Sequence, residues 1–134
     1  MALHKANRLR SRHDFRAVFR EGTRRYGTHL TLRALAKKAS TDANKSATST
    51  QARDEPTRIG ISVSTKVSKR AVIRNRIKRQ LRVAFRNLLP KIPPGWLLVV
   101  IVQPSAVQAE CSYHEFLQEL EQLLTEAEVI DGHS

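Results

Sequence analysis

Residues 69–86 read KRAVIRNRIKRQLRVAFR, a segment with eight lysines and arginines and no acid. If successive residues are turned by about 100° around a helix axis, the apolar side chains form one stripe and the cations occupy the opposite face. The pattern predicts an amphipathic helix from Ser68 to about Leu89, ended by Pro90 and by the following Pro-Pro-Gly sequence. The apolar stripe consists of Ile73, Ile77, Leu81, Ala84, Phe85 and Leu88.

Two segments on either side of this helix have the patterns of β-strands. Residues 58–64, RIGISVS, alternate between apolar side chains on one face and small or polar side chains on the other. Gly60 leaves that second face flat, so a backbone or an aromatic ring can approach it closely. Residues 96–102, WLLVVIV, are continuously apolar, which indicates a strand covered on both faces.

The N-terminal third of the chain predicts a helix and a strand. Ser11 and Asp14 have the spacing of a capping box, which favours a short helix from Arg12 to Glu21, and Gly22 is a natural stop. Residues 28–36 alternate in polarity and predict a strand.

The C-terminal part predicts a further helix after a second capping-box pattern, formed by Ser112 and Glu115. Together these elements indicate an α/β (α+β) sandwich with one sheet and helices packed on it. We expect residues 1–134 to form a single domain with a flexible loop at about 37–56, a segment rich in Ala, Ser and Thr. The apolar stripe of the last helix is Phe116, Leu117, Leu120, Leu123 and Leu124.

The charge of the chain, +12 in total, is divided into blocks. Residues 1–55 carry 13 cations and 5 acids, residues 56–109 carry 11 cations and no acid, and residues 110–134 carry 7 acids and neither Lys nor Arg. An acid-free basic segment of this length favours a polyanionic partner, with nucleic acid ahead of an anionic membrane surface. On the basic helix, arginine can bind phosphate in a bidentate manner, lysine adds point charges, and Asn75 can touch a base or a 2′-OH.

The run from Arg70 to Arg82 resembles the RNR signature of the bacterial ribonuclease P protein component. Three other segments resemble that family in the same order: residues 8–22, the strand at 58–64 followed by Lys66, and residues 96–104. The resemblance covers about residues 8–125 and implies about four strands, three helices and a left-handed βαβ crossover through the signature helix.

The resemblance also implies a function. In this family the RNA subunit removes the 5′ leader of precursor tRNA by Mg²⁺-dependent hydrolysis, while the protein binds that catalytic RNA and holds the leader. The residues expected to bind the catalytic RNA are Arg70, Arg74, Asn75, Arg76, Lys78, Arg79 and Arg82. Those expected to line a leader-binding cleft are Phe15, Phe19, Arg33, Arg58, Ser62 and Lys66. We expect no catalytic or metal-binding residue in the protein and a monomer outside the ribonucleoprotein.

Some points stay open. Phe15 and Phe19 share a helix face with Val18, so the rings could belong to the core or could face the leader. Many family members carry an aromatic residue near the position of Arg33, and a lysine is common where this chain has Thr65. Both departures bear on how the leader is contacted.

The sequence also bears on three other functions. A general or ribosomal RNA-binding protein would explain the basic helix equally well. A helix-turn-helix protein would need a short helix before the basic one, whereas here a strand precedes it. A protein-only nuclease would need clustered carboxylates, which residues 56–109 lack, and the five histidines show no ligand spacing. The single cysteine, Cys111, is expected to be a partly buried thiol. Without a signal peptide or a long apolar segment, we expect a cytoplasmic protein that does not enter membranes.

Overall fold

The computed structural model describes residues 7–36 and 56–130, so nearly all of the loop predicted at 37–56 lies outside the described residues. The described chain forms a four-stranded mixed sheet with the strand order β1-β2-β4-β3. The strands are β1 (Thr23–Tyr26), β2 (Leu30–Ala36), β3 (Arg58–Ser62) and β4 (Trp96–Val102). β1 and β2, like β2 and β4, are antiparallel, whereas β3 and β4 are parallel.

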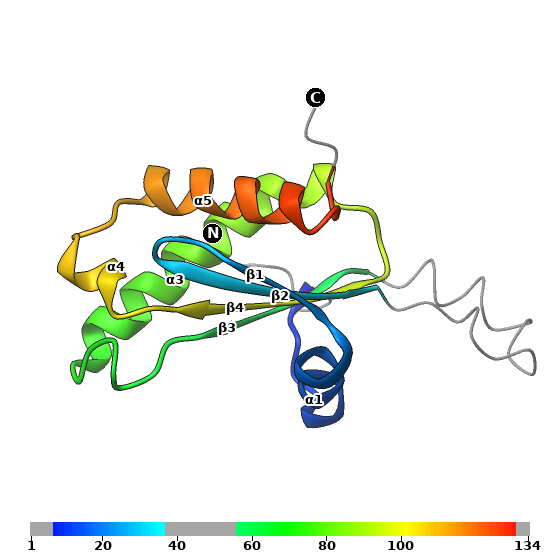
Figure 1. Ribbon diagram of the computed structural model, residues 1–134. Helices are drawn as coiled ribbons and strands as arrows, with labels where there is room; N and C mark the ends of the chain where they lie inside the picture. Colours follow the sequence, from blue (N-terminus) through cyan, green and yellow to red (C-terminus); the bar gives the residue numbers. More distant parts are fainter. Residues whose placement is uncertain (1–6, 37–55, 131–134) are drawn as a thin grey trace, which may run out of the picture.

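Helices cover both faces of this sheet (Figure 1). The long helix α3 (Ala71–Leu88) and the last helix α5 (Tyr113–Glu126) lie on one side, and α1 (Arg12–Glu21) lies on the other. A 3₁₀ turn, η3 (Leu89–Lys91), follows α3, and the four-residue α4 (Ser105–Gln108) precedes α5. The α/β sandwich expected from the sequence is therefore confirmed. The parallel neighbours β3 and β4 are joined through α3, which is the connection that the predicted crossover requires.

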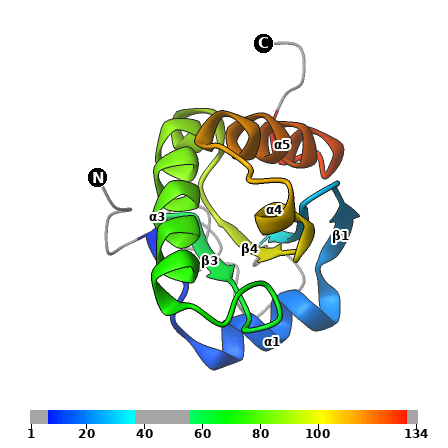
Figure 2. The same cartoon turned by 90° about the vertical axis from the view of Figure 1, so that its left-hand side faces the viewer.

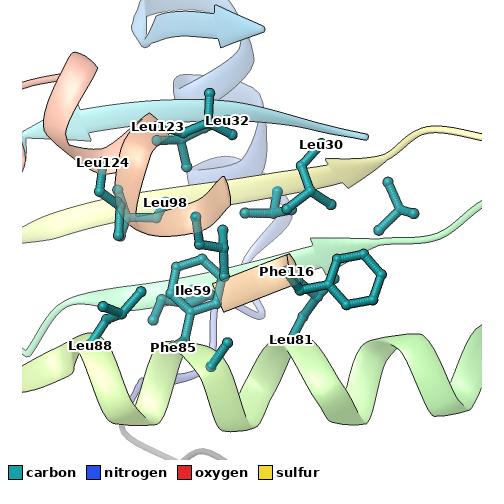
Figure 3. Packing of buried hydrophobic residues seen from close by; sticks show 14 of the residues in the cluster. Leu30, Leu32, Ile59, Leu81, Phe85, Leu88, Leu98, Phe116, Leu123 and Leu124 are labelled. Carbon is teal, nitrogen blue, oxygen red and sulfur yellow. The ribbon is translucent and has the colours of Figure 1, made fainter. Parts of the chain in front are cut away.

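The central strand β4 separates two apolar clusters. Leu98, Val100 and Val102 belong to the larger cluster, to which α3 contributes Phe85 and α5 contributes Leu124 (Figure 3). Leu97 and Val99 point the other way, into a smaller cluster with Leu9 and Val18 beneath α1. Leu98, Val99 and Val100 are each 0% exposed, so the continuously apolar run is buried on both faces as predicted.

The predicted starts of α1 and α5 agree with the structure, because an N-cap residue fixes each of them. Ser112 and Glu115 form the full reciprocal capping box of α5. At α1 only half of the box forms: the Ser11 hydroxyl accepts a hydrogen bond from the Asp14 backbone N–H at 3.3 Å. The Asp14 carboxylate instead lies 3.7 Å from the Arg58 guanidinium, which ties α1 to β3.

The predicted ends of α3 and two strands were less accurate. α3 begins at Ala71 instead of Ser68, because Ser68 forms part of the preceding turn and its hydroxyl accepts from the Arg70 backbone N–H. β2 starts at Leu30 and β3 ends at Ser62, each two residues inside the predicted strand. Near Leu30 the chain forms a turn, in which the Gly27 N–H donates to the Leu30 carbonyl.

The edge strand β1 and the short α4 were not predicted. All four β1 residues, TRRY, are exposed, so the sequence has no apolar alternation that would predict a strand here. Its existence depends on pairing with β2, from Thr23 opposite Ala34 to Tyr26 opposite Thr31.

Gly60 provides the close approach that its sequence context suggested. A Cβ atom at this position would lie 2.6 Å from Cζ of Phe15, so the ring of α1 rests directly on the backbone of β3. This contact sets how closely α1 packs on the sheet.

We predict that Gly60→Ala destabilises the fold by about 1–3 kcal/mol, because the added methyl group must displace the Phe15 ring. Urea unfolding measures the change, and Ser62→Ala, at an exposed position two residues further along the same face of β3, should stay within about 0.5 kcal/mol of the unsubstituted protein. Equal stability of both variants would show that the ring can move without cost.

Candidate nucleic-acid interface

Helix α3 separates its apolar and cationic side chains as the sequence predicts. Ile77, Leu81, Phe85 and Leu88 are buried against the sheet and α5. The predicted RNA-binding residues lie on the remaining surface of α3 and at its N-cap. Arg70, Asn75, Arg76 and Arg79 are exposed, while Arg74, Lys78 and Arg82 are partly buried, so their stems cover apolar surface near the charged heads.

The cations of α3 have no acidic partner among residues 7–36 and 56–130, where the ion pairs are Arg20–Glu21, Arg58–Asp14 and Lys91–Glu121. Like charges three or four residues apart on a helix destabilise it. A bound polyanion would remove that repulsion, which makes this face a candidate phosphate-binding surface.

Arg74 and Arg70 differ from the other predicted residues because they also shape the start of α3. The Arg74 guanidinium donates to the Ser68 carbonyl at 2.8 Å, which closes the turn before the helix. Arg70 is the N-cap residue and provides no side-chain cap. A substitution of Arg74 would therefore change the helix start as well as the charge.

Four acidic residues of the C-terminal segment lie on α5, while Glu110, before that helix, lines a hollow together with Arg76 of α3. Lys91, in η3, is paired with Glu121 of α5 at 2.7 Å. Glu119 accepts hydrogen bonds from the backbone N–H groups of His29 and Leu30, at 2.8 and 2.7 Å, so it holds the β1–β2 turn. These carboxylates have structural roles on the α5 side.

The two phenylalanines of α1, which were predicted together, occupy different environments. Val18 is fully buried and Phe15 is partly buried against Gly60, so these two side chains belong to the smaller apolar cluster. Phe19 is 41% exposed and is the ring available to a ligand.

Arg33 of β2 lies over the Phe19 ring, with its Cζ atom 4.6 Å from the ring centroid. The same guanidinium donates to the Phe19 carbonyl at 2.8 Å, and its Nε atom is buried without a hydrogen-bond partner among the described residues. The pair presents a ring and a fixed positive charge side by side, a combination suited to a base and its phosphate.

The remaining predicted leader contacts are spread over the same side of the sheet. Arg58 forms an ion pair with Asp14 and thereby helps to hold α1 on the sheet. Ser62 is exposed at the end of β3, and Lys66 is exposed in the turn between β3 and α3. The structure therefore places Phe19, Arg33, Ser62 and Lys66 where RNA could reach them, and gives Phe15 and Arg58 packing roles.

Two further residues belong to this side of the sheet although the sequence analysis did not select them. Arg24 and Tyr26 lie on β1, and Tyr26 is 66% exposed. The sequence TRRY places two arginines beside an aromatic residue, which is a pattern found in nucleic-acid-binding surfaces. The sequence does not say which face of the sheet these side chains occupy, because that depends on the strand register.

Other chemical sites find little support in the described part of the chain. Within residues 7–36 and 56–130, no three His, Cys, Asp or Glu side chains are grouped so as to hold a metal ion. Burial raises the pKa of the Cys111 thiol, and the neighbouring Glu115 and Glu119 raise it further, so the thiolate is disfavoured. No helix of this part is both long enough and apolar enough to span a membrane.

Comparison with known proteins agrees with this geometry. The family model described as Ribonuclease P matches residues 3–128. The ribonuclease P protein component of Trichormus variabilis is 61% identical to this chain, and that of Synechocystis sp. is 39% identical. The alignments cover 100% of the chain in both cases, and 100% and 96% of the respective relatives.

Solved structures give the same result. The Thermotoga maritima RNase P protein superposes with a TM-score of 0.69 at 26% identity, covering 89% of this chain and 96% of that one. A Staphylococcus aureus RNase P protein mutant with defective mRNA degradation activity gives 0.74 at 25% identity, covering 94% and 92%. The family match over nearly the whole sequence, the full-length relatives and the shared fold together establish that this chain belongs to the ribonuclease P protein family.

Proposed function

We propose that the chain acts as the protein subunit of ribonuclease P, binding the catalytic RNA through α3 and the 5′ leader of precursor tRNA through the α1 side of the sheet. In this role it assists Mg²⁺-dependent removal of the leader to give the mature 5′ end. The observation that carries the proposal is the cationic face of α3, which has no acidic partner within the described residues. Membership of the family supplies the link to ribonuclease P.

The contacts with the catalytic RNA would be made mainly to its backbone. Arg76 and Arg79 are exposed and one helical turn apart, so both can reach phosphates along one strand. Asn75 is exposed beside them and adds a neutral donor and acceptor for a 2′-OH or a base edge. Such a surface recognises the shape and charge of a folded RNA.

The contact with the leader would depend on stacking. The exposed Phe19 ring can receive a base of any identity, while Arg33 supplies charge for a neighbouring phosphate. Stacking tolerates every base because all four have a π-face, which suits a protein that meets leaders of different sequence. Arg33 would in this way replace the aromatic residue common in the family.

The chemistry of cleavage would belong to the RNA. The side chains of the proposed interface are cations, an amide and an aromatic ring, which bind and orient RNA but do not form a carboxylate site for Mg²⁺. We propose that Mg²⁺ is bound through the RNA subunit, where it supplies the metal chemistry of phosphodiester hydrolysis. We further propose that the protein is cytoplasmic and monomeric outside the ribonucleoprotein.

A reconstitution assay tests this function. The purified protein is mixed with a bacterial ribonuclease P RNA and a 5′-labelled precursor tRNA, with protein-alone and RNA-alone controls. We expect the protein to lower the Mg²⁺ requirement for cleavage and to tighten precursor binding, while cutting nothing alone. Binding to the RNA without any change in cleavage would instead identify a general RNA-binding protein.

The α3 surface is tested by the salt dependence of RNA binding. Arg76→Ala and Arg79→Ala should each weaken binding and reduce the log–log salt slope by about 0.7–0.9, because each removes a phosphate contact. Lys91→Ala is the matched control, since Lys91 is an exposed cation paired with Glu121 on the α5 side. An unchanged slope in both arginine variants would remove α3 from the interface.

The leader contact is tested at Phe19. Phe19→Ala should weaken binding of precursor tRNA roughly 5- to 100-fold, the range expected for losing one stacked base, and leave mature tRNA binding unchanged. Phe19→Tyr keeps an aromatic face and should retain affinity. Equal losses for precursor and mature tRNA would mean that the ring supports the fold instead of the leader.

A further inference from the structure

The strand register shows which side chains of β1 lie on the face of the sheet that α1 covers. Arg24 is paired with Arg33, and Tyr26 with Thr31. In an antiparallel sheet, paired residues point to the same face. Arg33 faces α1 because it lies over Phe19, so Arg24 and Tyr26 extend that face to the outer edge of the sheet.

Arg24 and Tyr26 repeat the arrangement of Arg33 and Phe19. The Arg24 guanidinium lies over the Tyr26 ring, with Cζ 5.6 Å from the centroid, and also bonds to the Tyr26 hydroxyl. The ring is 66% exposed. Two arginine–aromatic pairs therefore lie next to each other, one on β1 and one between α1 and β2, with their arginines directly opposite in the register.

This arrangement is electrostatically unfavourable for the protein alone. Arginines at directly opposed positions on two strands repel each other. Neither has an acidic partner among the described residues, and Glu21, at the end of α1, lies next to Arg20 at 3.6 Å. A phosphate between the two guanidinium groups would convert the repulsion into attraction.

The opposite face of β1 is not available for the same purpose. Arg25 points to α5, where its Nε donates to the Glu126 carbonyl at 3.3 Å. Tyr26 also borders a hollow of about 460 Å³ between the β1–β2 turn and α5, which Glu115, Glu119 and Glu126 line. Those carboxylates repel phosphate, so only the α1-facing side of β1 suits a nucleic acid.

From this placement we propose that the single-stranded 5′ leader continues past Phe19 and Arg33 onto β1, where Tyr26 stacks a second base and Arg24 binds its phosphate. The inference rests on the proposed leader contact at Phe19 and extends it to the sheet edge. A stacking platform needs an unpaired base, since bases of a duplex are already stacked. The folded catalytic RNA would lie elsewhere, because α3 and β1 are on opposite sides of the molecule (Figure 2).

The experiment measures binding of precursor tRNAs whose leaders are lengthened one nucleotide at a time, using protein reconstituted with a bacterial ribonuclease P RNA. The affinity of the unsubstituted protein should rise once when the leader reaches Phe19, and a second time when the leader becomes long enough to reach β1. Tyr26→Ala should lose that later gain, roughly 5- to 50-fold, and match the unsubstituted protein on short leaders. Arg24→Ala should lower the salt slope by about 0.7 on long leaders only.

Two variants serve as controls. Arg25→Ala removes a cation from the same strand but from its α5-facing side, and its binding curve should superimpose on that of the unsubstituted protein. Tyr26→Phe keeps the ring and should retain the gain on long leaders.

The inference is overturned if Tyr26→Ala binds every leader as tightly as the unsubstituted protein, or loses affinity equally for long leaders, short leaders and mature tRNA. Self-association of the variant with unchanged affinity would mean that these residues only protect a sheet edge. Phe19→Ala on the same series separates the two proposals. If it alters leader binding while Tyr26→Ala does not, only the extension to β1 fails; if neither does, the leader contact itself fails.

Discussion

The pairing of β4 with a strand on each side is the constraint on which the rest of the structure depends. Trp96–Val102 pairs along seven residues with β2 and along five with β3, and its apolar side chains enter both clusters. A strand buried on both faces must be covered by separate layers. One layer is α3 with α5, and the other is α1, so the basic helix and the aromatic helix are held on opposite sides of the sheet (Figure 1).

That separation gives the molecule two surfaces of different chemistry. The exposed surface of α3 presents cations without an acidic partner among residues 7–36 and 56–130, which in the proposed function would bind a phosphate backbone without regard to sequence. The α1 side presents rings beside guanidinium groups, which in the proposed function would hold an unpaired strand. The acids on α5 have another use: Glu119 holds the β1–β2 turn through the backbone of His29 and Leu30, and Glu121 binds Lys91. These two carboxylates are thus held by partners on the α5 side of the molecule.

Both interfaces keep like charges close together in the free protein, at a cost in stability. The fold tolerates this cost because its stability comes from the buried clusters. Phe85, Phe116 and the leucines around them are fully or almost fully buried (Figure 3). Binding RNA would relieve the repulsion, so the charge arrangement favours the bound state.

The sequence by itself determined the elements that bury apolar residues: the two-faced strand 96–102, the stripe of α3, the capped α5 and the order in which they occur. Periodicity reveals such elements because burial imposes it. The charge pattern selected the basic helix, and the resemblance to the family selected the positions of Phe15, Phe19 and Arg33. The edge strand β1 has four exposed residues and no period, so only its hydrogen bonds to β2 define it. Likewise, only tertiary packing could divide Phe15 from Phe19. The two rings share a helix face, but Gly60 of a distant strand receives one, while Arg33 covers the other and leaves it accessible.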